Sequence, residues 1–231
     1  MTSNAWRPRA ASWRSLWNLR FPRYFARLQL GLFLLGLGLA VMLEARIGLD
    51  PWSSFHEGVS IRTGWSFGRV SQVVGALLIL FSWFTMRVRP GIGTVSNMLI
   101  VGPWVDLIRV QPWIPHGPGG VLGVATFCAG LVLVGLASAT YIGARLGAGP
   151  RDGFVLALSR KFGRSLRATR ISIELVVLMV GFALGGPIGL GTVLFAVLMG
   201  PIMQASLRLF GVGHDPSPTW RVAEAASPIR G

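Results

Sequence analysis

The sequence contains little of what soluble domains and metal sites are built from. Its 231 residues include one cysteine, three histidines, one lysine and eight acids, and only 13% of the residues are charged. A single cysteine excludes disulfide scaffolds, zinc clusters and iron–sulfur centres, and with so few histidines we expect no metal site. About a quarter of an ordinary soluble domain is charged. This chain therefore has too little charge to cover a soluble surface.

Long apolar segments are present instead. Hydrophobic residues make up 52% of the chain, and its mean hydropathy is +0.59. Six apolar segments can be marked, at 28–43, 70–86, 92–105, 121–142, 171–184 and 192–207. Such segments are typical of membrane-spanning helices, although several fall at or below the roughly 17 to 25 residues of a straight span. No stretch alternates with period two, so we predict an all-α polytopic membrane protein.

The chain has an internal duplication. Residues 36–64 align with residues 135–163 at a constant offset of 99, with ten identities in 29 positions. After a one-residue shift, GIGT at 91–94 matches GLGT at 189–192. Each copy holds three apolar segments and one mixed stretch of 13 residues that starts at a proline, at 51–63 and 150–162. These stretches are too short to span, so we predict a short interfacial or re-entrant helix in each copy.

Three spans per copy is an odd number, so the second copy should enter the membrane upside down relative to the first. The distribution of charge supports this inversion. Residues 44–69 carry three acids and three arginines, whereas the matching residues 143–170 carry seven basic residues and one acid, Asp152. The positive-inside rule then places both termini and the loops near 88 and 155 in the cytoplasm, and the loops near 55, 115 and 188 outside. We therefore predict two inverted repeats in a bacterial plasma (inner) membrane.

The tails complete this organisation. Residues 1–27 carry six arginines, six aromatic residues and no acid, which is typical of a tail that lies on anionic lipid headgroups, with a short helix ended by Pro22. A disordered tail would explain the same composition. The predicted order is the basic cytoplasmic tail 1–27, repeat 1 at 28–110, the external linker 111–120, repeat 2 at 121–210 and the cytoplasmic tail 211–231.

The net charge of +14 raises the question of a nucleic acid partner. By the predicted topology, 18 of the 22 basic residues lie on the cytoplasmic side and are separated by apolar segments. A nucleic-acid-binding protein would gather them on one face. We therefore expect the lipid bilayer as the partner, and no nucleic acid.

Glu174 is the most informative single residue, because it lies about five residues inside an otherwise apolar segment. A carboxylate there is costly unless it is paired or protonated. Arg170 lies one helical turn before it, at the spacing of a helical ion pair. The two residues could form a structural pair that locks neighbouring helices, or they could handle an ion or proton.

Further polar residues are candidates for a solute or ion pathway. Asp106 and its repeat mate Gln204 could line one pathway from opposite sides, or Asp106 could be an interfacial cap. The free N–H groups at the starts of the short helices could hold an anionic group, or the helices could be ordinary interfacial ones. His56 could titrate near neutral pH, or be merely tolerated there. The full set is Glu174, Arg170, Asp106, Asn97, Gln204 and His56, with the helix starts Asp50, Pro51, Gly149, Pro150, Arg151 and Asp152.

Several of these positions carry a resemblance to a known family. GAGPRDG at 147–153, GGPIGLGT at 185–192, and Arg170 with Ile173 and Glu174 resemble the YczE-type (YczE/YyaS/YitT-like) bacterial membrane proteins. The first copy adds Pro51, Trp52, His56, residues 91–94, Asn97, Met98 and Asp106. At position 53 the family pattern has aspartate and this chain has Ser53, so a carboxylate role there does not carry over. The resemblance implies an integral, multispan inner-membrane protein with no settled activity.

The functional expectation follows from this architecture. We expect no enzyme and no cofactor, because no Ser/His/Asp or Cys/His set falls on one side of the membrane and the GxGT sequences lack the preceding strand of a phosphate-binding loop. Inverted repeats with interrupted helices recur in transporters. The sequence therefore predicts a small secondary transporter or channel for a small solute or ion. The alternative is a non-transporting scaffold or regulatory partner of another membrane complex, and a homo-oligomer is compatible with either.

Overall fold

The computed structural model describes residues 21–88, 90–147 and 149–212, and these residues form eight α-helices and no strand. In order they are α1 (Phe21–Glu44), α2 (Pro51–Thr63), α3 (Phe67–Met86), α4 (Ile92–Arg109), α5 (Gly120–Ile142), α6 (Pro150–Phe162), α7 (Leu166–Ala183) and α8 (Leu190–Leu209). The predicted all-α fold is confirmed for this part of the chain. The two short helices, α2 and α6, have the bounds expected from the sequence.

Four of the six expected spans are long and apolar enough to cross a membrane: α1, α3, α5 and α8. The other two, α4 and α7, have 18 residues each, about 27 Å at 1.5 Å per residue, but carry several charged side chains. The described part of helix α1 begins at Phe21, seven residues before the apolar segment 28–43, and it includes Pro22. The short helix expected before Pro22 falls on residues outside the described part of the chain. The remaining parts of the expected tails, 1–20 and 213–231, lie outside the described residues.

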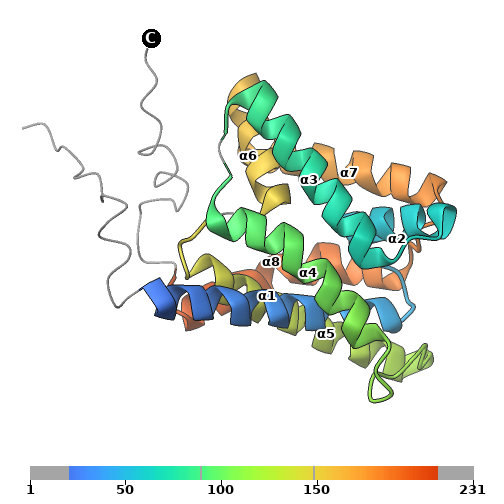
Figure 1. Cartoon of the computed structure of the whole chain (residues 1–231). Helices are drawn as coiled ribbons and strands as arrows, with labels where there is room; N and C mark the ends of the chain where they lie inside the picture. Colours follow the sequence, from blue (N-terminus) through green and yellow to red (C-terminus); the bar gives the residue numbers. More distant parts are fainter. Residues whose placement is uncertain (1–20, 89, 148, 213–231) are drawn as a thin grey trace, which may run out of the picture.

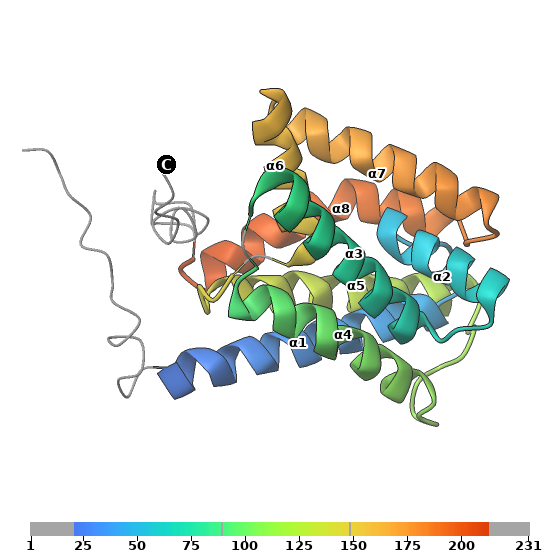
Figure 2. The same cartoon turned by 45° about the horizontal axis from the view of Figure 1, so that its top comes forward.

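The helices form two groups (Figures 1 and 2). Helices α1 and α5 lie side by side, with α4 packed against α1 and α8 packed against α5. In the second group, α2 packs against α7 and α6 packs against α3. Helix α3 also packs against α4, which joins the two groups. The pair of α1 and α5 is therefore the centre of the fold, and its contacts bury Leu28, Leu32, Phe127 and Leu131.

Glycine allows α1 and α5 to approach closely. A Cβ at Gly38 would lie 2.9 Å from the carbonyl oxygen of Gly130, and a Cβ at Gly130 would lie 2.8 Å from the carbonyl oxygen of Gly38. Membrane helices that pack through their backbones commonly have small residues at the contact, because these leave room for the opposite chain. The two glycines therefore set the spacing of the central pair.

Positions that the sequence alignment pairs have matching surroundings. In the first copy, Gly36 of α1 faces Trp104 of α4. In the second copy, the aligned residues are Gly135 of α5 and Ile202 of α8, and they face each other in the same way. At the ends of the short helices, Ser60 Oγ donates to the Trp65 carbonyl (2.6 Å). The mate of this bond runs from Ser159 Oγ to the Arg164 carbonyl (2.7 Å). The correspondence between the copies thus extends from sequence to local structure.

Candidate functional site

The loops that lead into α2 and α6 are each bonded to the other half of the chain. Before α2, the carbonyl of Ile47 accepts from Gly191 N of α8 (2.7 Å), and Thr192 Oγ1 donates to the Leu49 carbonyl (2.8 Å). Before α6, the carbonyl of Leu146 accepts from Gly93 N of α4 (2.8 Å). Ile47 and Leu146 are mates in the alignment, as are Gly191 and Gly93, so the bonds are reciprocal. They fix the starts of α2 and α6 between the two halves.

The two short helices begin differently. The carboxylate of Asp50 caps α2, because its Oδ2 accepts from Ser53 N (3.2 Å). Helix α6 begins after Gly149 with no side-chain cap, and Asp152 in its first turn accepts instead from the Tyr141 hydroxyl (3.1 Å). A Cβ at Gly149 would lie 3.6 Å from Asp152 Oδ2 and 3.7 Å from Asn97 Nδ2. The start of α6 therefore lies among polar groups of α4 and α5.

Arg151 of α6 reaches across to α2. One of its terminal nitrogens lies 3.2 Å from His56 Nδ1, and its guanidinium carbon lies 5.3 Å from the centre of the Trp52 ring. A guanidinium can only donate, so Nδ1 accepts and the ring proton lies on Nε2. Burial, and next the charge of Arg151, lowers the pKa of His56 well below its usual range. His56 is therefore a neutral, oriented imidazole, which argues against the alternative that it titrates near neutral pH.

Four buried polar atoms at the start of α2 have no hydrogen-bond partner among the described residues. They are Asp50 Oδ1, Ser53 Oγ, Ser54 Oγ and His56 Nε2. In most proteins nearly every buried polar atom has a partner, so four within seven residues is an unusual concentration. We call Asp50, Ser53, His56 and Arg151 the α2–α6 site. Ser54 is left out because its hydroxyl lies at the turn between α7 and α8, where a Cβ at Gly186 would be 2.8 Å from its Oγ. The sequence analysis named Ser53 only as a departure from the family pattern and did not name Ser54, because a serine in a short helix of mixed composition carries no signal of burial.

The ion pair expected in α7 is present and lies near this site. Arg170 Nε donates to Glu174 Oε1 at 2.9 Å. The charge of Arg151 interacts with those of Asp50, Asp152 and Glu174, and the charge of Arg170 interacts with Asp152. The structure thus brings most of the sequence-predicted residues into one charged neighbourhood.

Asp106 and Gln204 do not meet there. Asp106 Oδ1 accepts from Gly68 N (2.9 Å) in the first turn of α3, which fits the alternative role of a cap. Gln204 is exposed on α8. Because α4 packs on α1 and α8 packs on α5, the central helix pair lies between the two residues. The expectation that they line one pathway has no support in this arrangement.

A second polar cluster was not expected from the sequence. Arg109 Nε donates to Glu44 Oε1 (2.8 Å), and its two terminal nitrogens lie 3.3 Å from the two carboxylate oxygens of Glu57. His116 Nδ1 lies 2.8 Å from Glu44 Oε2. We call Glu44, Glu57, Arg109 and His116 the Glu44 cluster. It connects the ends of α1 and α4 with α2 and the linker, and its members are too far apart in sequence for any local pattern to indicate it.

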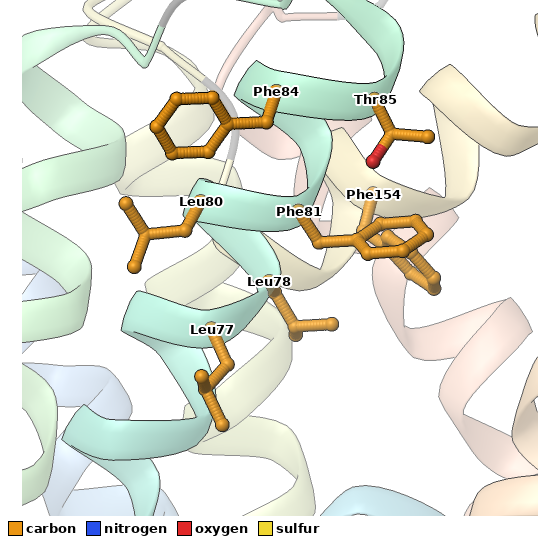
Figure 3. A pocket seen from close by; sticks show the side chains of 7 residues that line it. All are labelled: Leu77, Leu78, Leu80, Phe81, Phe84, Thr85 and Phe154. Carbon is orange, nitrogen blue, oxygen red and sulfur yellow. The ribbon is translucent and has the colours of Figure 1, made fainter.

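One groove is apolar and lies apart from these charges (Figure 3). It has a volume of about 560 Å³ between α3 and α6, and its lining includes the rings of Phe81 and Phe154, whose centroids lie 5.8 Å apart. The other lining residues are Leu77, Leu78, Leu80, Phe84 and Thr85. Lipid tails are as apolar as leucine, so a membrane protein can leave such a surface exposed to lipid. This groove does not form part of the α2–α6 site.

Comparison with known proteins places this arrangement among membrane proteins. Residues 22–208 match a model described as "Family of unknown function (DUF6198)". The "Uncharacterized membrane protein YczE" of Bacillus subtilis (strain 168) is 35% identical over 82% of this chain and 86% of its own length. An "Uncharacterized protein" of Haemophilus influenzae is 32% identical over 87% and 91%, and the "Uncharacterized protein YyaS" of Bacillus subtilis is 24% identical over 78% and 90%. No solved structure matches the chain.

Proposed function

Because this multi-pass membrane protein belongs to the DUF6198 family, as the resemblance to YczE-type proteins implied, we propose that it is a small secondary transporter or channel with two inverted repeats. One observation carries the proposal. The loop before each short helix is hydrogen-bonded to the first turn of a helix from the other half, and the residues of one bond are aligned with those of the other. In transporters with inverted repeats, the substrate site lies where the repeats meet, at the ends of interrupted helices. The α2–α6 site has that position.

The helix contacts support the same symmetry. Exchanging the two halves maps α1 onto α5, and it maps the pairing of α1 with α4 onto that of α5 with α8. It also maps the pairing of α2 with α7 onto that of α6 with α3. The charge contrast between residues 44–69 and 143–170 supports an inverted orientation, with both termini in the cytoplasm of a bacterial inner membrane.

The polar interior favours transport over the scaffold alternative. A scaffold needs a packed core and an outer binding surface, and gains nothing from buried polar atoms without partners. The α2–α6 site contains three such atoms beside a half-buried arginine from the other half of the chain. Leaving buried polar groups unpaired is costly, so their retention fits a site that a solute occupies.

Reconstitution tests the proposal. Purified protein in liposomes is exposed to gradients of neutral, zwitterionic, anionic and cationic small solutes, and entry is followed by light scattering. We expect one class to enter faster than into protein-free liposomes, and Arg151→Gln to abolish that difference. The matched control is Arg167→Gln, which removes an exposed arginine one helix away and should leave entry unchanged. A folded protein that carries no solute above the protein-free rate would refute transport.

A further inference from the structure

We propose that the α2–α6 site binds a small zwitterionic solute, a molecule with an ammonium-type donor at one end and a carboxylate-type acceptor at the other. The observation behind this inference is the set of unpartnered buried atoms in α2 together with Arg151 from α6. It deepens the proposed function and rests on it for the route by which a solute reaches the site. Binding itself can be measured without transport.

The unpartnered atoms include both kinds of hydrogen-bonding group. His56 Nε2 carries the ring proton and donates, because Nδ1 already accepts from Arg151. The hydroxyl of Ser53 can also donate. Asp50 Oδ1 can only accept, since the other oxygen of its carboxylate already caps α2. A ligand that satisfies these three atoms must therefore accept at one end and donate at the other.

Charge balance restricts the ligand further. Asp50 and Arg151 interact electrostatically, and they have opposite charges beside a neutral His56. A lone anion or a lone cation would add a net charge to a buried site, which is costly without a counter-charge. The neighbouring Arg170–Glu174 pair is neutral as a pair. Asp152 also interacts with Arg151 and Arg170, but it is exposed, and solvent screens an exposed charge far more than a buried one. A solute without net charge avoids this cost.

The positions of the two charges complete the argument. Asp50 belongs to one half of the chain and Arg151 to the other, and each stands at the start of a short helix. A zwitterion would place its ammonium group at Asp50 Oδ1 and its carboxylate at Arg151, His56 and the Ser53 hydroxyl. It would therefore contact both halves at once, whereas a polyol would leave the two charges without ionic partners.

The test uses the full chain in detergent and a series of small probes that differ by one charge each. Glycine carries both charges, acetate only the negative one and methylammonium only the positive one, and glycerol carries neither. Glycine betaine keeps both charges but has no N–H to donate to Asp50 Oδ1. We expect glycine to raise the melting temperature and to bind in an equilibrium titration, with glycine betaine weaker by about tenfold, the effect of one charge-assisted hydrogen bond.

Three variants locate the binding. Asp50→Asn keeps a good helix cap but removes the charge, and Ser53→Ala removes one buried hydroxyl. We expect the first to weaken glycine binding by about tenfold or more and the second by less. The matched control is Ser82→Ala, because Ser82 Oγ in α3 is also buried without a partner but lies outside the site. This variant should bind glycine as the parent protein does.

Four results would overturn the inference. They are equal stabilisation by acetate or methylammonium, stabilisation by glycerol alone, no response to any probe, and equal loss of binding in the Ser82→Ala control. Failure of transport gives a different pattern. Glycine binding at the α2–α6 site without solute entry into liposomes would leave this inference standing and refute the transporter. If another class of solute enters the liposomes and no zwitterion binds, the transporter stands and this inference is refuted.

Discussion

Glu44 shows how one carboxylate at a helix end can connect several elements. Its side chain is 5% exposed, and Arg109 binds it through one nitrogen while pairing with Glu57 of α2 through the other two. Arg46 also approaches Glu44, but at 3.9 Å and with a side chain that is 69% exposed. The two arginines therefore contribute very differently, since an ion pair stabilises a fold chiefly when its loss leaves a buried charge uncompensated.

This difference gives a prediction at the scale of single residues. Arg109→Gln should lower the free energy of unfolding by about 3 kcal/mol, because it leaves a buried Glu44 carboxylate short of its main partner. Arg46→Gln, the matched control, should change it by well under 1 kcal/mol. Thermal unfolding of both variants in the same detergent measures the difference. Equal losses in the two variants would show that the Glu44 cluster does not hold α1, α2 and α4 together.

The residue scale also separates what the sequence can predict from what it cannot. The Arg170–Glu174 pair was predicted because a spacing of four residues on a helix fixes the geometry. The contact of Arg151 with His56 joins residues 95 apart, and no local rule fixes such a distance. The sequence identified both residues as candidates from their positions at the short helices. Only the packing of α6 against the rest of the fold determines that they meet.

At the scale of elements, the largest difference between the two halves is the packing of α3 against α4. Helix α3 packs against α4, and a Cβ at Gly102 of α4 would lie 2.8 Å from the Cα of Gly68. In the second half Gly68 is replaced by Arg167, and a Cβ at Gly200, the mate of Gly102, would meet no atom within 4 Å. Among the described helices, α7 and α8 make no comparable contact. At this contact the first half is therefore closely packed, whereas the matching place in the second half is open.

Glycine substitution tests this asymmetry. Gly102→Ala should lower the free energy of unfolding by about 2 kcal/mol, because its methyl group would overlap the α3 backbone. Gly200→Ala should change it by no more than about 1 kcal/mol in either direction, because the added methyl group meets open space. Both glycines precede a proline in the middle of a helix, so the effect of the following proline on stability cancels when the two variants are compared. Chemical unfolding in detergent gives the comparison, and similar losses would indicate that α7 and α8 also close.

The element boundaries show why some predictions succeed. Both short helices begin at a proline and end before a glycine with positive φ, +72° at Gly64 and +60° at Gly163, so the sequence marks both ends. The apolar segment marked at 28–43 leaves out the first seven residues of α1 as the structure describes it, because Arg23 and Arg27 interrupt the apolar pattern there. Hydrophobicity marks the apolar part of a helix, whereas hydrogen bonding extends the helix into charged residues.

At the scale of the whole molecule, the sequence predicted a duplication but not how its copies meet. The central contact of α1 with α5 depends on Gly38 and Gly130, two of the 31 glycines in the chain. Composition does not distinguish these two from glycines that face open space. The structure adds the reciprocal bonds at Gly93 and Gly191, which tie each short helix to the opposite half. Together these contacts relate the copies in space.

Orientation in the membrane is the last prediction and follows from charge over the whole chain. The region 44–69 has three acids and three arginines, whereas its mate 143–170 has seven basic residues and one acid, a contrast of 0 against +6. Basic loops remain in the cytoplasm, so a reporter fused after Arg62 should lie outside and one fused after Arg164 should lie inside. Paired fusions to a periplasm-active and a cytoplasm-active enzyme measure the side of each position. Two loops on the same side would show that an even number of spans separates α2 from α6, and the inverted arrangement of the repeats would be wrong.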